Sequence, residues 1–200
     1  MLAPIDFYFD FASPYGYVAS HHIDEIAEKH VRVAVWRPMM LGAAFKTVGT
    51  GPLVNYPIKG DYMLHDLRRT ARAEGFSITL PPGFPHATLA AARTFYWIAD
   101  NDEALAKTFA RAFFDAYFST GEDVSPAEAT ADIAASAGLD RDAVLAAVQD
   151  PAIKERLKRE TDTALERGVF GSPFIFIDGE PFWGSDRLDQ VDKWLETGGW

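Results

Sequence analysis

Ser13 is the first residue whose type and position could serve chemistry, because it stands between a predicted strand and a predicted helix. Pro14 favours the first helical position, which makes Ser13 the predicted N-cap. An N-cap lies beside free backbone N–H groups and the positive end of the helix dipole, where anions bind. No Gly-x-Ser-x-Gly motif surrounds Ser13, so its hydroxyl suits donation of a hydrogen bond to an anion better than nucleophilic attack. The simpler interpretation, an N-cap without further function, stays open.

Two further motifs lie near the other end of the sequence. Ser172 precedes Pro173 at the start of an apolar run, and the segment Trp183-Gly184-Ser185-Asp186 follows ten residues later. In that segment Ser185 could cap a helix, with Asp186 in the first turn. Alternatively, the Asp186 carboxylate could bind the ammonium group of a ligand while the N–H and hydroxyl of Ser185 hold a carboxylate.

Weaker candidates are Lys46, Asn55 and Lys59, which fall in a stretch over 42–60 that is rich in glycine and proline and is predicted to be a loop. Binding residues concentrate on loops held by a scaffold, so these three could contact an anionic substrate. The five histidines show no spacing typical of metal ligands, and we expect no metal site.

The composition limits the chemistry further. The 200 residues include no cysteine, which excludes disulfides, thiolate metal sites and a cysteine nucleophile, so any thiol chemistry needs a sulfur from elsewhere. A net charge of −10 argues against binding to nucleic acid or anionic lipid. No apolar run reaches the ~20 residues of a membrane span, and the first residues do not resemble a signal peptide, so we expect a cytoplasmic protein.

The elements that must position these residues begin with a β-α-β unit. Alternating residues predict a strand over 5–11, a helix follows from Pro14 to about Lys29, and a second strand covers 31–36 and is ended by Pro38. After the 42–60 loop come predicted helices at 61–74, 86–100, 102–118, 126–137, 141–149 and 151–167.

Several helix ends carry capping signals. Residues 125–128, Ser-Pro-Ala-Glu, form a predicted capping box with proline at the first helical position. Asp140 and Asp150 precede two further helices, and Gly138 and Gly168 stand at predicted C′ positions.

The chain ends with a predicted hairpin and helix. An apolar strand from Phe174, an Asp178-Gly179 turn and a second short strand form the hairpin, and a last helix runs to about Leu195. This order is that of an α/β thioredoxin-like fold with an all-helical insertion after the second strand. Residues 1–38 and 166–200 would form the thioredoxin-like domain and 39–165 the insertion. In that architecture Pro173 is cis, faces the first helix, and leaves the backbone of Ser172 free to pair with an extended peptide.

Three motifs carry a family resemblance. Residues 7–15 (Phe-Tyr-Phe-Asp-Phe-Ala-Ser-Pro-Tyr), 171–173 (Gly-Ser-Pro) and 182–188 (Phe-Trp-Gly-Ser-Asp-Arg-Leu) resemble the 2-hydroxychromene-2-carboxylate isomerases. These belong with the kappa-class glutathione transferases in the DsbA-like branch of the thioredoxin fold. The stretch 59–69 is also similar, and the resemblance spans essentially the whole chain.

The resemblance implies a glutathione site. It implies that Ser13 binds the glutathione sulfur, that Ser172 before Pro173 pairs with the cysteinyl backbone, and that the segment 183–186 forms the γ-glutamyl site. The family usually has asparagine where this chain has Ser185, and serine keeps only part of the amide's hydrogen bonds. Lys46, Asn55 and Lys59 fall in the family's substrate-side region.

The implied activity is a glutathione-dependent cis/trans isomerisation of 2-hydroxychromene-2-carboxylate and trans-o-hydroxybenzylidenepyruvate, or a related aromatic keto acid, by reversible thiolate addition. The resemblance also suggests a homodimer. One alternative is a kappa-class-like transferase that consumes glutathione on electrophiles or peroxides. An alternative of another class is a non-catalytic, peptide-binding thioredoxin-like module.

Overall fold

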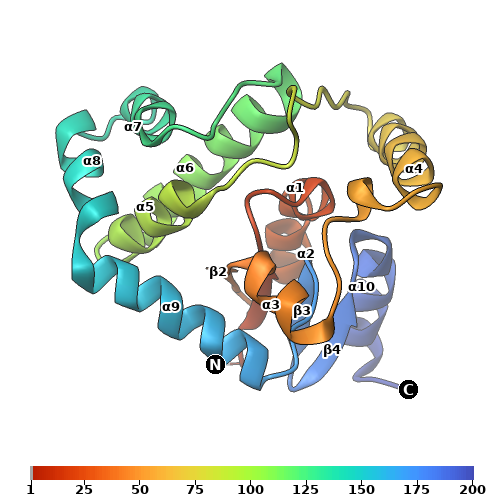
Figure 1. Ribbon diagram of the computed structural model, residues 1–200. Coiled ribbons are helices and arrows are strands. Elements are labelled where there is room, and N and C mark those ends of the chain that lie inside the picture. The colour runs from red at the N-terminus through yellow and green to blue at the C-terminus, as the bar shows by residue number, and fades with distance from the viewer. Residues whose placement is uncertain (1) are drawn as a thin grey trace.

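The computed structural model describes residues 2–200 and contains one four-stranded sheet with the order β2-β1-β3-β4 (Figure 1). Strands β1 and β2 are parallel, whereas β3 runs antiparallel to β1, and β4 antiparallel to β3. The strands are β1 (Ile5–Phe9), β2 (Ala34–Pro38), β3 (Phe174–Ile177) and β4 (Glu180–Trp183). The predicted thioredoxin-like order is therefore confirmed.

The first β-α-β unit differs from the prediction in three places, of which the first is that β1 ends at Phe9 rather than at residue 11. The single helix predicted up to Lys29 is wrong, because the chain forms α1 (Pro14–Ser20) and α2 (Ile23–Lys29) with a break at residues 21–22. Near the break, the Ser20 hydroxyl donates to the Tyr17 carbonyl at 2.7 Å, a local bond of the kind that bends helices. The second strand covers residues 34–38 rather than 31–36; it includes Pro38, which an edge strand tolerates.

The stretch predicted as a loop over 42–60 contains helix α3 (Leu41–Val48) and the short 3₁₀ turn η1 (Leu53–Asn55). The prediction fails here because the signal that starts α3 is not local. The N–H of Leu41 donates to Asp10 Oδ2 at 2.7 Å, and the N–H of Met40 donates to the Thr161 hydroxyl at 3.1 Å. Helix α4 (Lys59–Ala73) follows, close to its predicted range.

From residue 86 onward, the helices of the insertion agree with the prediction in number and order. They are α5 (Leu89–Ala99), α6 (Glu103–Phe114), which continues as the π-helical segment η2 (Asp115–Thr120), α7 (Ala127–Ser136), α8 (Arg141–Gln149) and α9 (Pro151–Glu166). In Figure 1 they form an arc around one side of the sheet, while α4 stands separately.

The predicted caps hold in part. Asp140 and Asp150 accept hydrogen bonds from the first turns of α8 and α9, as predicted. The capping box is wrong: Pro126 is itself the N-cap of α7, and the Ser125 hydroxyl donates to Asp123 instead.

The core joins the insertion to the sheet through aromatic side chains. Phe9 of β1 lies 5.5 Å from Phe114, and Phe11 lies 5.1 Å from Phe113, as measured between ring centroids. All four rings are buried. A second, smaller cluster covers the other face of the sheet around Tyr8 and includes residues of α3 and α9. The division of the chain into a thioredoxin-like domain (1–38 and 166–200) and a helical insertion (39–165) stays a prediction. Met1 lies outside the described residues.

The C-terminal segment confirms the hairpin but not the start of the last helix. Asp178 and Gly179 have φ angles of 52° and 94°, as a two-residue hairpin turn requires. Helix α10 (Leu188–Thr197) begins after the 3₁₀ turn η3 (Ser185–Arg187), and neither Ser185 nor Asp186 caps it. Their polar groups are therefore left for another use. Within residues 2–200, none of the helices has the length and apolarity needed to cross a membrane.

Candidate active site

A cavity of about 1650 Å³ opens beside the β1–α1 turn. It lies between α3, η1 and α4 on one side and the segments before β3 and after β4 on the other, and the start of α5 also lines it. Of the predicted site residues, the lining includes Ser13, Ser172, Lys46 and the whole segment 183–186. It does not include Pro173, Asn55 or Lys59; Lys46, Asn55 and Lys59 are all exposed.

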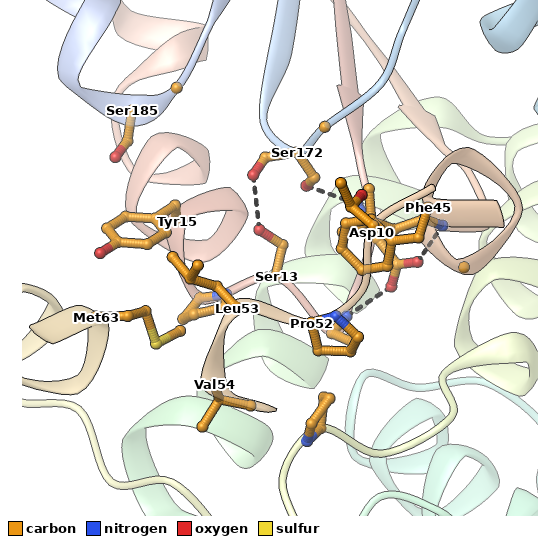
Figure 2. A pocket seen from close by; sticks show the side chains of 18 of the residues that line it. Asp10, Ser13, Tyr15, Phe45, Pro52, Leu53, Val54, Met63, Ser172 and Ser185 are labelled. Carbon is orange, nitrogen blue, oxygen red and sulfur yellow. Dashed lines mark hydrogen bonds between the residues drawn. The ribbon is translucent and has the colours of Figure 1, made fainter. Parts of the chain in front are cut away.

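The three predicted motifs together form one polar wall of the cavity. Ser13 lies at the centre of this wall and is only 5% exposed (Figure 2). It is the N-cap of α1, and its hydroxyl oxygen accepts the Gly16 N–H at 3.0 Å. The same hydroxyl donates to the Ser172 carbonyl at 3.0 Å. Helix α1 has only seven residues, so its dipole is weaker than that of the long helix predicted from the sequence.

Ser172 brings the second predicted motif to the same place. Its bond to Pro173 is cis, as the thioredoxin-like order predicts. The Ser172 side-chain oxygen accepts the Asp10 N–H at 3.0 Å, and its carbonyl accepts the Ser13 hydroxyl and no other donor of the described chain. Among residues 2–200 no group accepts the Ser172 N–H, so this backbone presents a donor and an acceptor beside the cavity.

The third motif forms the adjacent part of the polar wall. Trp183 is 55% exposed and packs on Phe170, with ring centroids 4.8 Å apart. Gly184 has a φ of 109°, and a Cβ there would lie 2.3 Å from Asp186 Oδ1, so only glycine fits. Within the described chain, neither the N–H nor the hydroxyl of Ser185 has a hydrogen-bond partner. The carboxylate of Asp186 is mostly exposed and lies 3.7 Å from Arg187.

Asp10 is a site residue that the sequence analysis missed. It is buried, and its carboxylate accepts three hydrogen bonds from three segments: from Ala12 N–H at 2.8 Å, Leu41 N–H at 2.7 Å and the Thr88 hydroxyl at 3.0 Å. Burial raises the pKa of Asp10 despite these donors, which act in the opposite direction. The only signal in the sequence is a lone acidic residue between Phe9 and Phe11 in an aromatic run.

Tyr15 is a second residue that was missed. Its hydroxyl donates to Asp66 Oδ2 at 2.8 Å, and Asp66 in turn pairs with Arg69 on the next turn of α4. Burial, together with the bond to Asp66, raises the pKa of Tyr15 above its ordinary value, so the phenol stays protonated and remains a donor. This bond attaches α4, one wall of the cavity, to the helix that carries Ser13.

The wall of the cavity formed by α3, η1 and α4 is mostly apolar and contains Lys46, which has no acidic partner within residues 2–200. Phe45, Leu53, Val54 and Met63 face the cavity (Figure 2). Lys46 on α3 makes no salt bridge or side-chain hydrogen bond within residues 2–200. It is therefore the lining cation best placed to bind a carboxylate. The described residues hold no group of three or more His, Cys, Asp or Glu side chains that could bind a metal ion.

Comparison with known proteins agrees with this geometry. The family model of the DSBA-like thioredoxin domain matches residues 4–196. The chain is 32% identical over 197 residues to a 2-hydroxychromene-2-carboxylate isomerase of Sphingobium xenophagum, covering 98% of this chain and 99% of the relative. The chain belongs to the DSBA-like thioredoxin family, in the branch of these isomerases.

The same branch contains glutathione transferases. The glutathione S-transferase kappa 1 of Caenorhabditis elegans is 26% identical, over 98% of this chain and 92% of that protein. A solved structure of a 2-hydroxychromene-2-carboxylate isomerase superposes with a TM-score of 0.87 at 28% identity, over 97% of this chain and 95% of that one. This chain is thus an enzyme of the family that includes both activities.

Proposed function

We propose that the protein is a glutathione-dependent cis/trans isomerase that interconverts 2-hydroxychromene-2-carboxylate and trans-o-hydroxybenzylidenepyruvate, or a related aromatic keto acid. The observation that carries the proposal is the convergence of polar groups on one wall of the cavity, of which the N–H of Ser172 and the N–H and hydroxyl of Ser185 have no hydrogen-bond partner within residues 2–200. These groups are the backbone of Ser172, the N–H and hydroxyl of Ser185, and the carboxylate of Asp186, all beside Ser13.

The chemical types of these groups suit a γ-glutamyl tripeptide with a thiol at its centre. Ser172 would pair with the cysteinyl backbone through its N–H and carbonyl, as in the addition of a short strand. Ser185 would hold the γ-glutamyl carboxylate, and Asp186 the ammonium group. Gly184 supports this arrangement, because its conformation lets the Asp186 carboxylate fold back against the backbone.

The residues around Ser13 would favour the ionised thiol. When bound, glutathione supplies a thiolate that adds reversibly to a conjugated double bond, which allows rotation about that bond before the thiolate leaves. A free thiol has a pKa of about 8.5 and is mostly protonated at neutral pH. Hydroxyl donors held at fixed positions lower that value, because hydrogen bonds to the charged form stabilise it.

Lys46 and the apolar wall would hold the second substrate. The ammonium group of Lys46 would bind the carboxylate of the keto acid, and Phe45, Val54 and Met63 would cover its aromatic ring. Lys46 lines the cavity, whereas Asn55 and Lys59, the other residues predicted for this role, lie outside the lining. We therefore assign the carboxylate to Lys46.

We further propose that the enzyme acts in the cytoplasm, where reduced glutathione is maintained, and as a homodimer. Because the chain is also related to the transferases, a second candidate function is a transferase reaction that consumes glutathione on electrophiles or peroxides. The two functions differ in whether glutathione is returned.

The test is an isomerisation assay with 2-hydroxychromene-2-carboxylate, with and without glutathione, combined with thermal unfolding. We expect activity only with glutathione, and about 2.7 kcal/mol of stabilisation at 100 times Kd. A protein that is not stabilised by glutathione, or that isomerises equally well without it, would refute the proposal. A peptide-binding module would show neither activity nor stabilisation by glutathione.

A further inference from the structure

Two hydroxyl groups, not one, meet at the start of α1. The place where a Cβ on Gly16 would stand lies 3.1 Å from Ser172 Oγ and 3.4 Å from Ser13 Oγ. Both serines line the cavity, and Figure 2 shows the dashed lines that run from Ser172 to Ser13 and to Asp10. The absence of a side chain on Gly16 keeps the space between the two hydroxyls open.

The hydrogen of the Ser13 hydroxyl is already in use. It is donated to the Ser172 carbonyl at 3.0 Å, while the Ser13 oxygen accepts the Gly16 N–H. A hydroxyl has one hydrogen, so Ser13 can donate to another acceptor only by giving up the bond to Ser172.

The hydroxyl of Ser172 differs from that of Ser13 in the use of its hydrogen. Its oxygen accepts the Asp10 N–H at 3.0 Å, but within residues 2–200 it donates to no acceptor. Ser172 is also partly exposed to the cavity, whereas Ser13 is 5% exposed. The bond from Asp10 holds the oxygen in place and leaves its hydrogen available.

We propose that the Ser172 hydroxyl is a further catalytic residue, which donates a second hydrogen bond to the sulfur of the bound thiol. This inference rests on the proposed function, since it assigns a role toward the same cofactor. Ser172 then acts twice: its backbone aligns the cysteinyl residue, and its side chain stabilises the thiolate. Pairing of the cysteinyl N–H with the Ser172 carbonyl would also compete with the Ser13 hydroxyl for that acceptor and so release it toward the sulfur.

A purely structural role for Ser172 makes a different prediction. If its oxygen served only to accept the Asp10 N–H, its loss would lower stability without changing the ionisation of a bound thiol. The ionisation of bound glutathione therefore separates the two roles.

The experiment compares Ser172→Thr with Ser172→Val, two side chains of the same shape of which only threonine has a hydroxyl. Bound glutathione is titrated in each variant by the ultraviolet absorbance of the thiolate, and thermal unfolding is followed in parallel. We expect Ser172→Thr to keep a midpoint of thiol ionisation close to that of the wild type, because its hydroxyl can donate to the sulfur. In Ser172→Val the midpoint of thiol ionisation should rise by about one pH unit, which leaves roughly tenfold less thiolate.

Equal midpoints in the two variants would overturn the inference, even if the valine variant is less stable. In that case glutathione would still bind and ionise in the wild type, and the proposed function would stand. If the wild type neither binds glutathione nor lowers the pKa of its thiol, the proposed function and this inference both fail. A double variant, Ser13→Ala with Ser172→Val, should ionise bound glutathione less readily than either single variant, since both hydroxyls donate to one sulfur.

Discussion

Replacing Ser13 with alanine removes two hydrogen bonds at one position. Its oxygen caps α1 through the Gly16 N–H, and its hydrogen is donated to the Ser172 carbonyl, both at 3.0 Å. Loss of an N-cap costs about 1 kcal/mol of unfolding free energy. For a chain of this length, that loss lowers the melting temperature by roughly 2–4 °C. The variant should therefore fold.

The expected effect on catalysis is larger. A hydrogen bond to a charged group is worth about 1.5–3 kcal/mol, and removal of one donor to a developing anion slows enzymes by about 10²-fold or more. Ser172 supplies a second donor in our proposal, so some thiolate should remain. We predict a loss of about 10²-fold in kcat/KM for isomerisation, with a raised pKa of the bound thiol.

The assay follows isomerisation at saturating glutathione as a function of pH, since a loss that comes from thiol ionisation becomes smaller at high pH. Two controls separate chemistry from folding. Ser13→Thr keeps a capping hydroxyl and should retain most activity. Ser20→Ala removes another buried hydroxyl from the same helix, outside the cavity, and should be fully active. A folded Ser13→Ala variant with an unchanged rate at neutral pH would refute the assignment of Ser13.

Three further substitutions test the surrounding residues. Because burial raises the pKa of Asp10, the native state holds the proton of this carboxyl to higher pH than the unfolded state. The contribution of Asp10 to stability is therefore complete at acid pH and is lost as the pH rises above about 4. Denaturant unfolding should show Asp10→Asn becoming more stable relative to the wild type over that range, and a difference that does not change with pH would contradict the raised pKa of Asp10. Gly184→Ala should weaken glutathione binding at least about tenfold, as measured by calorimetry, because Gly184 has a positive φ and a Cβ there would contact Asp186. Gly138→Ala is the control: its φ is 91° and the space around it is open, so it should have the same backbone strain without the loss of binding. Lys46→Met should raise KM for the aromatic keto acid about tenfold and leave the Kd of glutathione unchanged, and an unchanged KM would rule out its carboxylate role.

Much of the fold follows from local sequence signals. The strand–helix–strand order, the Asp178-Gly179 turn and the caps at Asp140 and Asp150 depend on neighbouring residues, and each was predicted. Helix α3 was not, because its first N–H bonds to Asp10, which is 31 residues away. Contacts of this kind exist only after the chain has folded.

The site was predictable to a similar extent. Ser13, Ser172 and the segment 183–186 carry recognisable motifs, and the structure brings them to one cavity. The supporting residues were missed because their roles are set by tertiary partners: the hydroxyl of Tyr15 finds its acceptor on α4, 51 residues away. For Ser185 the sequence allows either a helix-capping role or a ligand-binding role. Because α10 begins at Leu188, Ser185 does not cap it.

The most direct test of the proposed function is the number of glutathione molecules consumed per molecule of keto acid converted. Total glutathione and its adducts would be measured by mass spectrometry before and after many turnovers with 2-hydroxychromene-2-carboxylate. We predict that consumption is near zero, because an isomerase returns the thiol at the end of each cycle. One glutathione consumed per turnover would contradict the proposal and identify a transferase instead.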